Sequence, residues 1–301
     1  MLRTRLASVS YLNALPLTWG LTHGARRPGF EILLTPPADC ARLLSDGLVD
    51  VALIPSVEFG RIPGLIWVPS TGVSSREEVR SVLLLTRVPP ERIETVALDV
   101  NSRTSVALVR LVLAHRYSCH PRMEPMAPDP DAMLANHDAA LLIGDHALAA
   151  SVEYARGASD YPGRPGTRVL DLAREWHEMT RMPFVFALWA CRPVVDAAEM
   201  SALLDWSLEE GLAHIDDIAS SEGSRTGLPA PVISSYLRHN IRYRLGPAEA
   251  DSLRLFYRMC RDEGILPGTG AKAAAGSVRA SGAADRPAIR RPGRADRNDS
   301  R

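Results

Sequence analysis

Residues 6–21 read Leu-Ala-Ser-Val-Ser-Tyr-Leu-Asn-Ala-Leu-Pro-Leu-Thr-Trp-Gly-Leu, a pattern typical of a short strand, a polar bend and the start of a helix. Small and branched apolar residues at the beginning suit a buried strand. Asn13 is a predicted N-cap, and Pro16 fits the first helical turn, where a missing N–H costs little. Ligands of open α/β sheets bind where strands end and helices begin. Ser10, Tyr11 and Asn13 are therefore expected either to contact a ligand or simply to end the strand and cap the helix.

A helix, a tight turn, a buried strand and a polar exit occur twice farther along the chain. Residues 39–45 predict a helix, and the apolar strand 49–54 follows an Asp-Gly turn and ends in Pro-Ser-Val-Glu. Residues 131–145 repeat this unit, with a strand over 138–143 that ends in Gly-Asp. An internal repeat of this kind indicates two lobes built on one plan.

The remaining pattern alternates strands with helices. Further strands are predicted at 30–34, 81–86, 95–98, 169–170 and 182–190, and further helices at 106–115, 171–179, 197–220, 231–240 and 248–263. This alternation, with one excursion into a second lobe and back, predicts an α/β protein with two lobes and a ligand cleft at the hinge.

The expected lobe boundaries follow from breaks in this pattern. Residues 1–88 and 183–267 are assigned to the first lobe, and residues 89–182 to the second. The chain is expected to cross between the lobes near 87–93, where Pro89-Pro90 interrupts it, and to return near Met179–Phe184. Residues 268–301 contain almost no large apolar side chain and are expected to be disordered.

Composition limits the class of protein. The chain has 301 residues, of which 46% are hydrophobic and 23% charged, as in ordinary globular proteins large enough for two cores. Its 35 basic and 35 acidic residues balance, so nothing indicates a nucleic-acid or membrane partner. The absence of a long apolar run or signal-peptide pattern predicts a cytoplasmic location. The cysteines lack metal-ligand spacing and are expected to be reduced and buried: Cys40, Cys119, Cys191 and Cys260.

Four blocks of the sequence point together to one family. They are Ser10–Leu17, Asp50–Glu58, Ser102–Val106, and Leu142–Asp145 with Met182–Trp189. These blocks resemble the chorismate dehydratase family of the futalosine route to menaquinone, and the resemblance spans residues 8–267. It implies a type 2 periplasmic-binding-protein fold, an α/β fold whose two lobes enclose a ligand cleft. It also implies a lyase that converts chorismate to 3-[(1-carboxyvinyl)oxy]benzoate and water, without a metal or an organic cofactor.

The implied reaction indicates which groups the cleft should hold. Loss of the ring proton builds negative charge that reaches the ring carboxylate, so groups that bind this carboxylate stabilise the transition state. The predicted helix that opens at Ser102, Arg103, Thr104 and Ser105 offers hydroxyl donors, free N–H groups and a positive dipole end. These residues are expected to bind substrate, although Ser and Thr are also common helix N-caps. Arg103 would pair with a second carboxylate or face solvent.

The resemblance assigns catalytic roles to Asn13 and Ser81. Asn13 would hydrogen-bond the departing hydroxyl or orient the ring, and Ser81 would donate to the leaving oxygen. Alternation along a strand would turn the neighbouring Arg80 to the opposite face and leave Ser81 usable in the cleft, although Ser81 could also simply begin a strand. Further substrate-binding candidates at strand ends are Ser10, Ser56, Gly144 and Asp145.

The base that removes the ring proton is not evident from the sequence. Glu58, Asp145 and His146 are candidates, but the two carboxylates can cap helices and the histidine can lie exposed. Our hypothesis is that the enolpyruvyl carboxylate of the substrate takes the proton. Proximity of this kind can lower a barrier by about 7 to 11 kcal/mol.

Two other classes of protein fit the same fold. A solute-binding protein would close on a small carboxylate without catalysis, but an export signal is missing. A regulatory sensor would need a DNA-binding helix-turn-helix, which the sequence lacks. The expected partner is thus chorismate, a small dicarboxylate, and exposed apolar area on the C-terminal helices would suit a homodimer.

Overall fold

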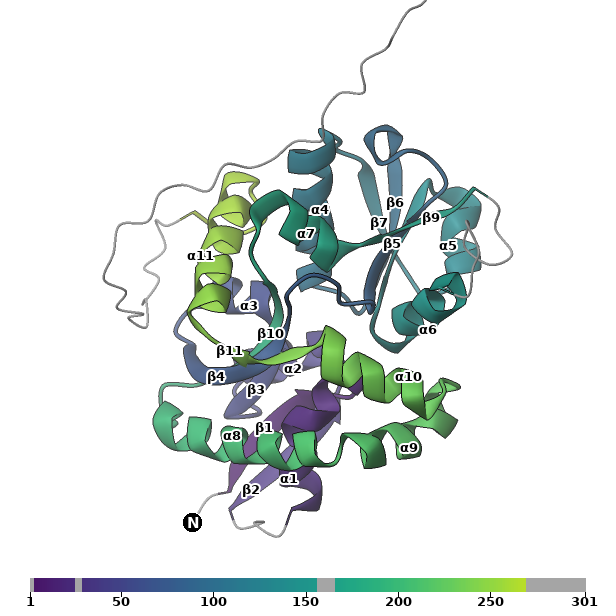
Figure 1. Ribbon diagram of the computed structural model, residues 1–301. Helices are drawn as coiled ribbons and strands as arrows, with labels where there is room; N and C mark the ends of the chain where they lie inside the picture. Colours follow the sequence, from purple (N-terminus) through teal and green to yellow (C-terminus); the bar gives the residue numbers. More distant parts are fainter. Residues whose placement is uncertain (1–2, 25–28, 156–165, 269–301) are drawn as a thin grey trace, which may run out of the picture.

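Two β-sheets organise the chain in the computed structural model, which describes residues 3–24, 29–155 and 166–268 (Figure 1). The six-stranded sheet has the order β11-β4-β10-β3-β1-β2, and its strands are β1 (Thr4–Val9), β2 (Phe30–Thr35), β3 (Val51–Pro55), β4 (Ile66–Ser75), β10 (Phe184–Cys191) and β11 (Arg242–Leu245). The five-stranded sheet has the order β7-β6-β8-β5-β9, and its strands are β5 (Val82–Thr86), β6 (Thr95–Asp99), β7 (Arg122–Met126), β8 (Ala139–Ile143) and β9 (Arg168–Asp171). The tail predicted to be disordered lies outside the described residues from 269 onward.

Helices cover both sheets, and we call the six-stranded sheet with its helices lobe I and the five-stranded sheet with its helices lobe II. Lobe I carries α1 (Leu15–His23), α2 (Pro37–Ser45), α3 (Ser56–Arg61), α8 (Ala197–Ala213), α9 (Ile215–Thr226), α10 (Ala230–Ser235) and α11 (Pro247–Asp262). Lobe II carries α4 (Thr104–Tyr117), α5 (Pro130–Asn136), α6 (Gly144–Ala155) and α7 (Leu172–Thr180). Short turns are η1 (Leu12–Ala14), η2 (Pro90–Arg92) and the π-helical η3 (Tyr236–Asn240). Among the described helices, none is both long and apolar enough to cross a membrane.

The two sheets repeat one plan, as the internal sequence repeat predicts. Parallel strands lie in the order β3-β1-β2 in lobe I and β8-β6-β7 in lobe II. An antiparallel strand flanks each set, β10 beside β3 and β5 beside β8. The repeated sequence unit corresponds to α2-β3-α3 in one lobe and α5-β8-α6 in the other.

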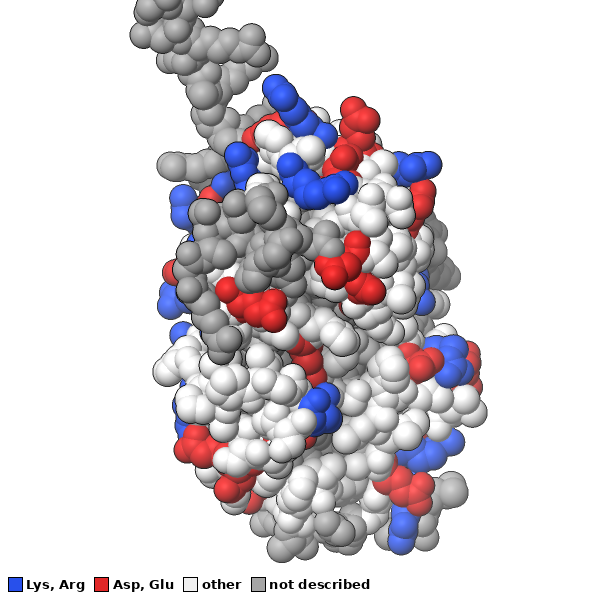
Figure 2. Space-filling view, turned by 90° about the vertical axis from the view of Figure 1, so that its right-hand side faces the viewer, with Lys and Arg blue, Asp and Glu red and all other residues white. Residues whose placement is uncertain are grey.

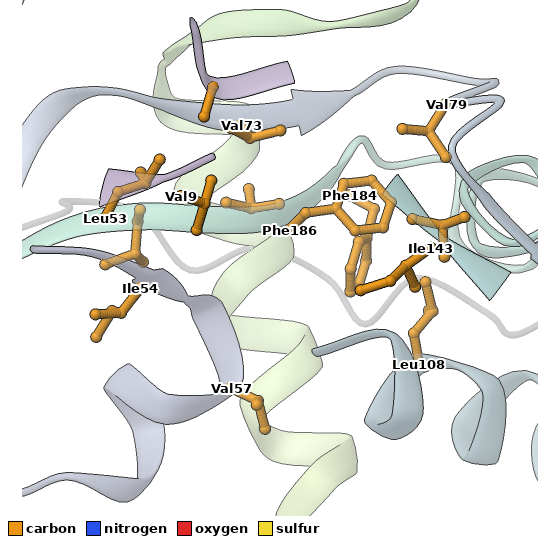
Figure 3. Close-up of a cluster of buried hydrophobic side chains, with 14 of the residues drawn as sticks. Val9, Leu53, Ile54, Val57, Val73, Val79, Leu108, Ile143, Phe184 and Phe186 are labelled. Atoms are coloured by element: carbon orange, nitrogen blue, oxygen red, sulfur yellow. The ribbon is translucent and has the colours of Figure 1, made fainter. Parts of the chain in front are cut away.

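Continuous apolar runs explain the central strands. Every residue of β3, β5 and β8 is buried, as expected of strands covered on both faces. The apolar core also continues from one lobe to the other. The rings of Phe184 and Phe186 on β10 meet edge to face at 4.9 Å between centroids, and they lie near Ile143 of lobe II and Val79 (Figure 3).

The first crossing between the lobes differs from the prediction. The predicted division places residues 81–86 in the first lobe, but β5 pairs antiparallel with β8 and β9 in lobe II. The chain therefore crosses between Ser75 and Val82, before β5, rather than at 87–93. An apolar run buried on both faces does not reveal which sheet it joins, because either sheet would bury it equally well. The return lies between α7 and β10, within the predicted segment.

Asp171 stabilises the turn at the first crossing, before β5. Its carboxylate accepts hydrogen bonds from the backbone N–H groups of Val79 at 3.1 Å and Arg80 at 2.6 Å. The same carboxylate is the N-cap of α7, where it accepts a bond from the Ala173 N–H at 3.0 Å. Burial raises the pKa of Asp171 to about 6.

This carboxyl group should make the stability of the fold depend on pH. The folded protein holds the proton at pH values where the unfolded chain, with an ordinary pKa of 3.8, releases it, so protonation favours folding. The free energy of unfolding should therefore lose about 3 kcal/mol from this group as pH rises from about 4 to about 6. Urea unfolding of the wild-type protein and of Asp171→Asn at several pH values measures this pH-dependent loss of stability. The variant keeps an acceptor oxygen without titrating, so identical pH profiles would contradict this prediction.

Candidate functional site

A cleft between the lobes collects polar groups that follow strands of both sheets. β1 leads into η1 and β6 into α4, so the carboxyl ends of parallel strands meet there. The cleft encloses about 560 Å³, including its open mouth. Its polar lining consists of Tyr11, Asn13, Asn101, Ser102, Arg103, Thr104 and Ser105, and its apolar lining includes Val9, Val73, Val79, Val82, Ile143 and Phe186. Larger hollows beside β11 and at the amino ends of β1 and β2 lie away from these strand ends. An apolar cleft with a few convergent polar groups is typical of a small-molecule site.

Asp145 joins the two lobes rather than lining the cleft. Its carboxylate, at the start of α6, accepts a hydrogen bond from the Leu12 N–H of lobe I at 3.1 Å. It also pairs with Arg225 of α9 at 2.8 Å. The face that carries α6 and α9 is indented between the lobes, and charged side chains of both signs lie in the indentation (Figure 2). The structure is therefore a closed arrangement of the lobes in which the Asp145 carboxylate is already occupied.

Gly144 supports the same contact through its backbone. Its φ of 63° is in the left-handed region, and a Cβ atom there would lie 3.2 Å from the Tyr11 ring. Its N–H donates to the Ser81 carbonyl oxygen at 2.9 Å, so this predicted binding group is also engaged within the protein.

A second bridge between the lobes uses Ser56 and Thr104. Thr104 Oγ1 accepts a hydrogen bond from the Val57 N–H at 3.2 Å and lies 3.5 Å from Ser56 Oγ. Ser56 is fully buried and donates to the Val185 carbonyl oxygen at 2.7 Å. Both hydroxyl groups are thus engaged in contacts within the protein, and Ser56 does not line the cleft. Ser10 is exposed and also lies outside the lining.

The N-terminus of α4 keeps unpaired donors at the cleft. The N-cap residue, Arg103, supplies no side-chain hydrogen bond to the helix, so the alternative role of Ser or Thr as a cap is not observed. Ser102 Oγ is buried without a hydrogen-bond partner among the described residues. Ser105 is 6% exposed and lines the cleft, and Arg103 is exposed at its edge. First-turn N–H groups of a helix have no acceptor within it, so this end of α4 can bind an anion.

Asn13 lies in the cleft but does not cap α1. It occupies the middle of η1, and α1 begins at Leu15 with Pro16 in its first turn and no side-chain cap. The intervening 3₁₀ turn moves the helix start two residues past Asn13, and this frees the amide from the helix. Asn13 Oδ1 is buried and has no hydrogen-bond partner in the described part of the chain.

Ser81 lies beside the cleft, at 1% exposure, between the lining residues Val79 and Val82. Its Oγ accepts a hydrogen bond from the Tyr236 hydroxyl at 2.7 Å. Strand alternation does not separate Ser81 from Arg80 as predicted, because both residues precede β5. The left-handed backbone of Arg80, with φ 61°, sets the direction in which the chain enters Ser81.

Tyr236 is a site residue that the sequence reasoning missed. It begins the π-helical turn η3 in lobe I and is 1% exposed. Burial raises the pKa of the Tyr236 phenol, while the nearby Asn13 amide lowers it. In the sequence, this tyrosine lies within a predicted C-terminal helix, where it is typical of ordinary core. A π-helical turn often marks a functional site, but it is visible only in the structure.

The conventional base candidates lie outside the cleft lining. Glu58 is 8% exposed and pairs with Arg61, Asp145 bridges the lobes, and His146 is exposed. Within the described residues, none of these three lines the cleft.

Comparisons with known proteins agree with the fold and identify the family. A family model described as menaquinone biosynthesis matches residues 4–262. The chain is 32% identical over 254 residues to the chorismate dehydratase of Thermus thermophilus, and the match covers 82% of this chain and 91% of that protein.

Similar solved structures share the predicted periplasmic-binding-protein fold. Protein AF1704 from Archaeoglobus fulgidus has a TM-score of 0.70 at 17% identity, covering 88% of this chain and 98% of that one. The periplasmic aliphatic sulphonate binding protein SsuA from Escherichia coli has a TM-score of 0.60 at 16% identity, covering 88% and 89%. At these identities the structures show the fold alone, whereas the sequence match extends over nearly all the described residues. The chain belongs to the menaquinone biosynthesis family.

Proposed function

We propose that this protein is a lyase that removes water from chorismate to give 3-[(1-carboxyvinyl)oxy]benzoate in menaquinone biosynthesis. The family and the chorismate dehydratase relative support this assignment. The observation that carries it is the convergence of Asn13, Ser102 and Ser105 on one cleft, with Ser81 beside it. Four free, buried cysteines suit a reducing compartment, so the proposal includes a cytoplasmic location.

In this proposal the N-terminus of α4 holds the ring carboxylate of chorismate. Ser102 Oγ, Ser105 Oγ and the first-turn N–H groups donate to it, and Arg103 at the cleft edge pairs with the second carboxylate. Negative charge develops on the ring carboxylate as the ring proton leaves. The donors therefore bind the transition state more strongly than the ground state, and that difference accelerates the reaction.

Asn13 and Ser81 act on the departing hydroxyl. Asn13 Oδ1 accepts its proton as a hydrogen bond, and Ser81 Oγ donates to its oxygen as the carbon–oxygen bond breaks. The ring proton passes to the enolpyruvyl carboxylate of the substrate itself. This carboxylic acid then returns the proton to the departing hydroxide, so that one water leaves and the carboxylate is restored. This assignment is supported by the engagement of Glu58 and Asp145 elsewhere in the protein.

Glu58→Gln should accordingly keep kcat for chorismate within about threefold of wild type, whereas loss of a general base typically costs about 10²- to 10⁴-fold. The carboxylate pairs with Arg61 and does not line the cleft, so it is not positioned to take the ring proton. Steady-state rates and substrate binding are measured separately for the variant. A loss in the range of a removed base with binding intact would contradict proton transfer to the substrate carboxylate.

Incubation of the purified protein with chorismate tests the function directly. The expected result is an aromatic product with its own ultraviolet spectrum and the mass of chorismate less one water. Binding of chorismate without any product would favour the solute-binding alternative. If the protein neither bound chorismate nor formed a product from it, the assignment to chorismate would be overturned.

A further inference from the structure

We propose that Tyr236 is a positioning residue that orients the hydrogen-bonding groups of Asn13 and Ser81, so that the cleft presents one acceptor and one donor to a single substrate hydroxyl. This inference rests on the proposed function and assigns to the departing hydroxyl a site built by three side chains. Asn13 comes from η1 and Tyr236 from η3, while Ser81 directly precedes β5. The site thus depends on segments that are far apart in the sequence.

The hydrogen bond between Tyr236 and Ser81 has a defined direction. The phenol donates its one proton to Ser81 Oγ at 2.7 Å. Ser81 must then direct its own proton elsewhere, and no acceptor for it is found in the described part of the chain. Val79 and Val82 on either side of Ser81 line the cleft, so a ligand there is the available acceptor.

The orientation of the Asn13 amide follows from the direction in which Tyr236 donates its proton. Tyr236 has given its proton to Ser81, so the phenol oxygen can only accept from Asn13. The amide therefore turns its NH₂ group toward Tyr236 and leaves Oδ1 free. This agrees with the buried Asn13 Oδ1, which has no partner among the described residues. A buried acceptor without a partner is costly, and a bound ligand would satisfy it.

An acceptor and a donor side by side match an alcohol. A hydroxyl group both donates and accepts a hydrogen bond, so it can satisfy Asn13 Oδ1 and the Ser81 proton together. An ether oxygen or a carboxylate has no proton to give and would leave the amide oxygen unpaired. The arrangement therefore selects the hydroxyl of chorismate over its enol ether and its two carboxylates at this point of the cleft.

The phenol is well suited to this fixed role. Tyr236 is almost fully buried, and burial keeps its pKa raised, so it stays a neutral donor throughout the working pH range. Tyr243 provides a matched comparison. It is 5% exposed, and its hydroxyl has no hydrogen-bond partner in the described residues.

The test compares Tyr236→Phe with Tyr243→Phe, each of which removes one buried hydroxyl and keeps the ring. Tyr236→Phe is expected to lower kcat for chorismate by about 10- to 100-fold, because misdirected groups cost rate, with KM within about threefold of wild type. Tyr243→Phe is expected to keep both constants. An unchanged kcat in Tyr236→Phe, or an equal loss in both variants, would overturn the inference.

A double-mutant cycle shows whether Tyr236 acts through Ser81. Added to Ser81→Ala, Tyr236→Phe should lower the rate by a smaller factor than it does in the wild-type protein, because one of the two groups that it orients is already gone. Single-turnover reactions at high enzyme concentration keep these slow variants measurable. Independent, multiplicative losses would overturn the inference while leaving the proposed function intact. Failure of the wild-type protein to dehydrate chorismate would instead overturn the proposed function.

Discussion

Asn13→Ala is expected to lower kcat for chorismate dehydration by about 10²-fold, the loss that follows when a reacting group is no longer held in position. The Asn13 side chain lines the cleft, and its buried Oδ1 has no partner within the described chain. This acceptor can therefore fix the orientation of the substrate hydroxyl before the carbon–oxygen bond breaks. Steady-state kinetics with chorismate measure the loss.

The same variant should fold normally, because Asn13 does not cap α1. Thermal unfolding of Asn13→Ala is therefore expected to match wild type closely, which separates a catalytic loss from a folding defect. Asn136→Ala is a suitable control, since that asparagine is exposed at the end of α5 in lobe II. Turnover by Asn13→Ala at the wild-type rate would contradict the role assigned to Asn13.

The start of the chain shows how far local sequence predicts this fold. The strand, the bend and the proline in the first helical turn all follow from the residue types between Leu6 and Leu21, and the structure has β1, η1 and α1 in that order. The predicted N-cap at Asn13 is wrong, because capping depends on where the helix starts. The one turn of 3₁₀ helix that shifts this start has no distinct signal in the sequence.

Long-range pairing limited the prediction of the lobe boundary. The apolar run at β5 predicts a buried strand, but the choice between two sheets depends on its partners, β8 and β9. The turn before β5 is held by hydrogen bonds to Asp171, which follows that turn by about ninety residues in the sequence. No local pattern around residues 79–82 indicates this contact.

The site shows the same division between local and distant information. The α4 start at Ser102–Ser105 was predicted from its hydroxyl-rich sequence, and the structure brings it to the cleft with Asn13. Tyr236 could not be selected, because its partner Ser81 is 155 positions away in the sequence. Ser56 and Asp145 have residue types suited to binding, but the closed lobes engage them in protein contacts. Whether a polar side chain is already paired can be decided only in three dimensions.

Ser102→Asp should raise KM for chorismate by at least about 100-fold. The substitution would place a carboxylate where the ring carboxylate of the substrate is proposed to bind, beside the N–H groups of the first turn of α4. Two like charges about 4 Å apart repel by about 4 kcal/mol at an effective dielectric constant near 20, and the new side chain would also occupy the donors. Ser102→Ala removes only one hydroxyl donor and should raise KM by less than about tenfold.

Ser118→Asp provides the matched control, because it makes the same change in charge at the opposite end of α4. Ser118 is exposed and its φ of 55° suits aspartate, so this variant should keep the wild-type KM. The ratio of the KM values of the two aspartate variants then reports the effect of the position of the charge and not that of the net charge of the protein. The effect in Ser102→Asp should also shrink as salt concentration rises, as far as the cleft admits ions. A wild-type KM in Ser102→Asp would place the substrate carboxylates elsewhere and remove the N-terminus of α4 from the proposed mechanism.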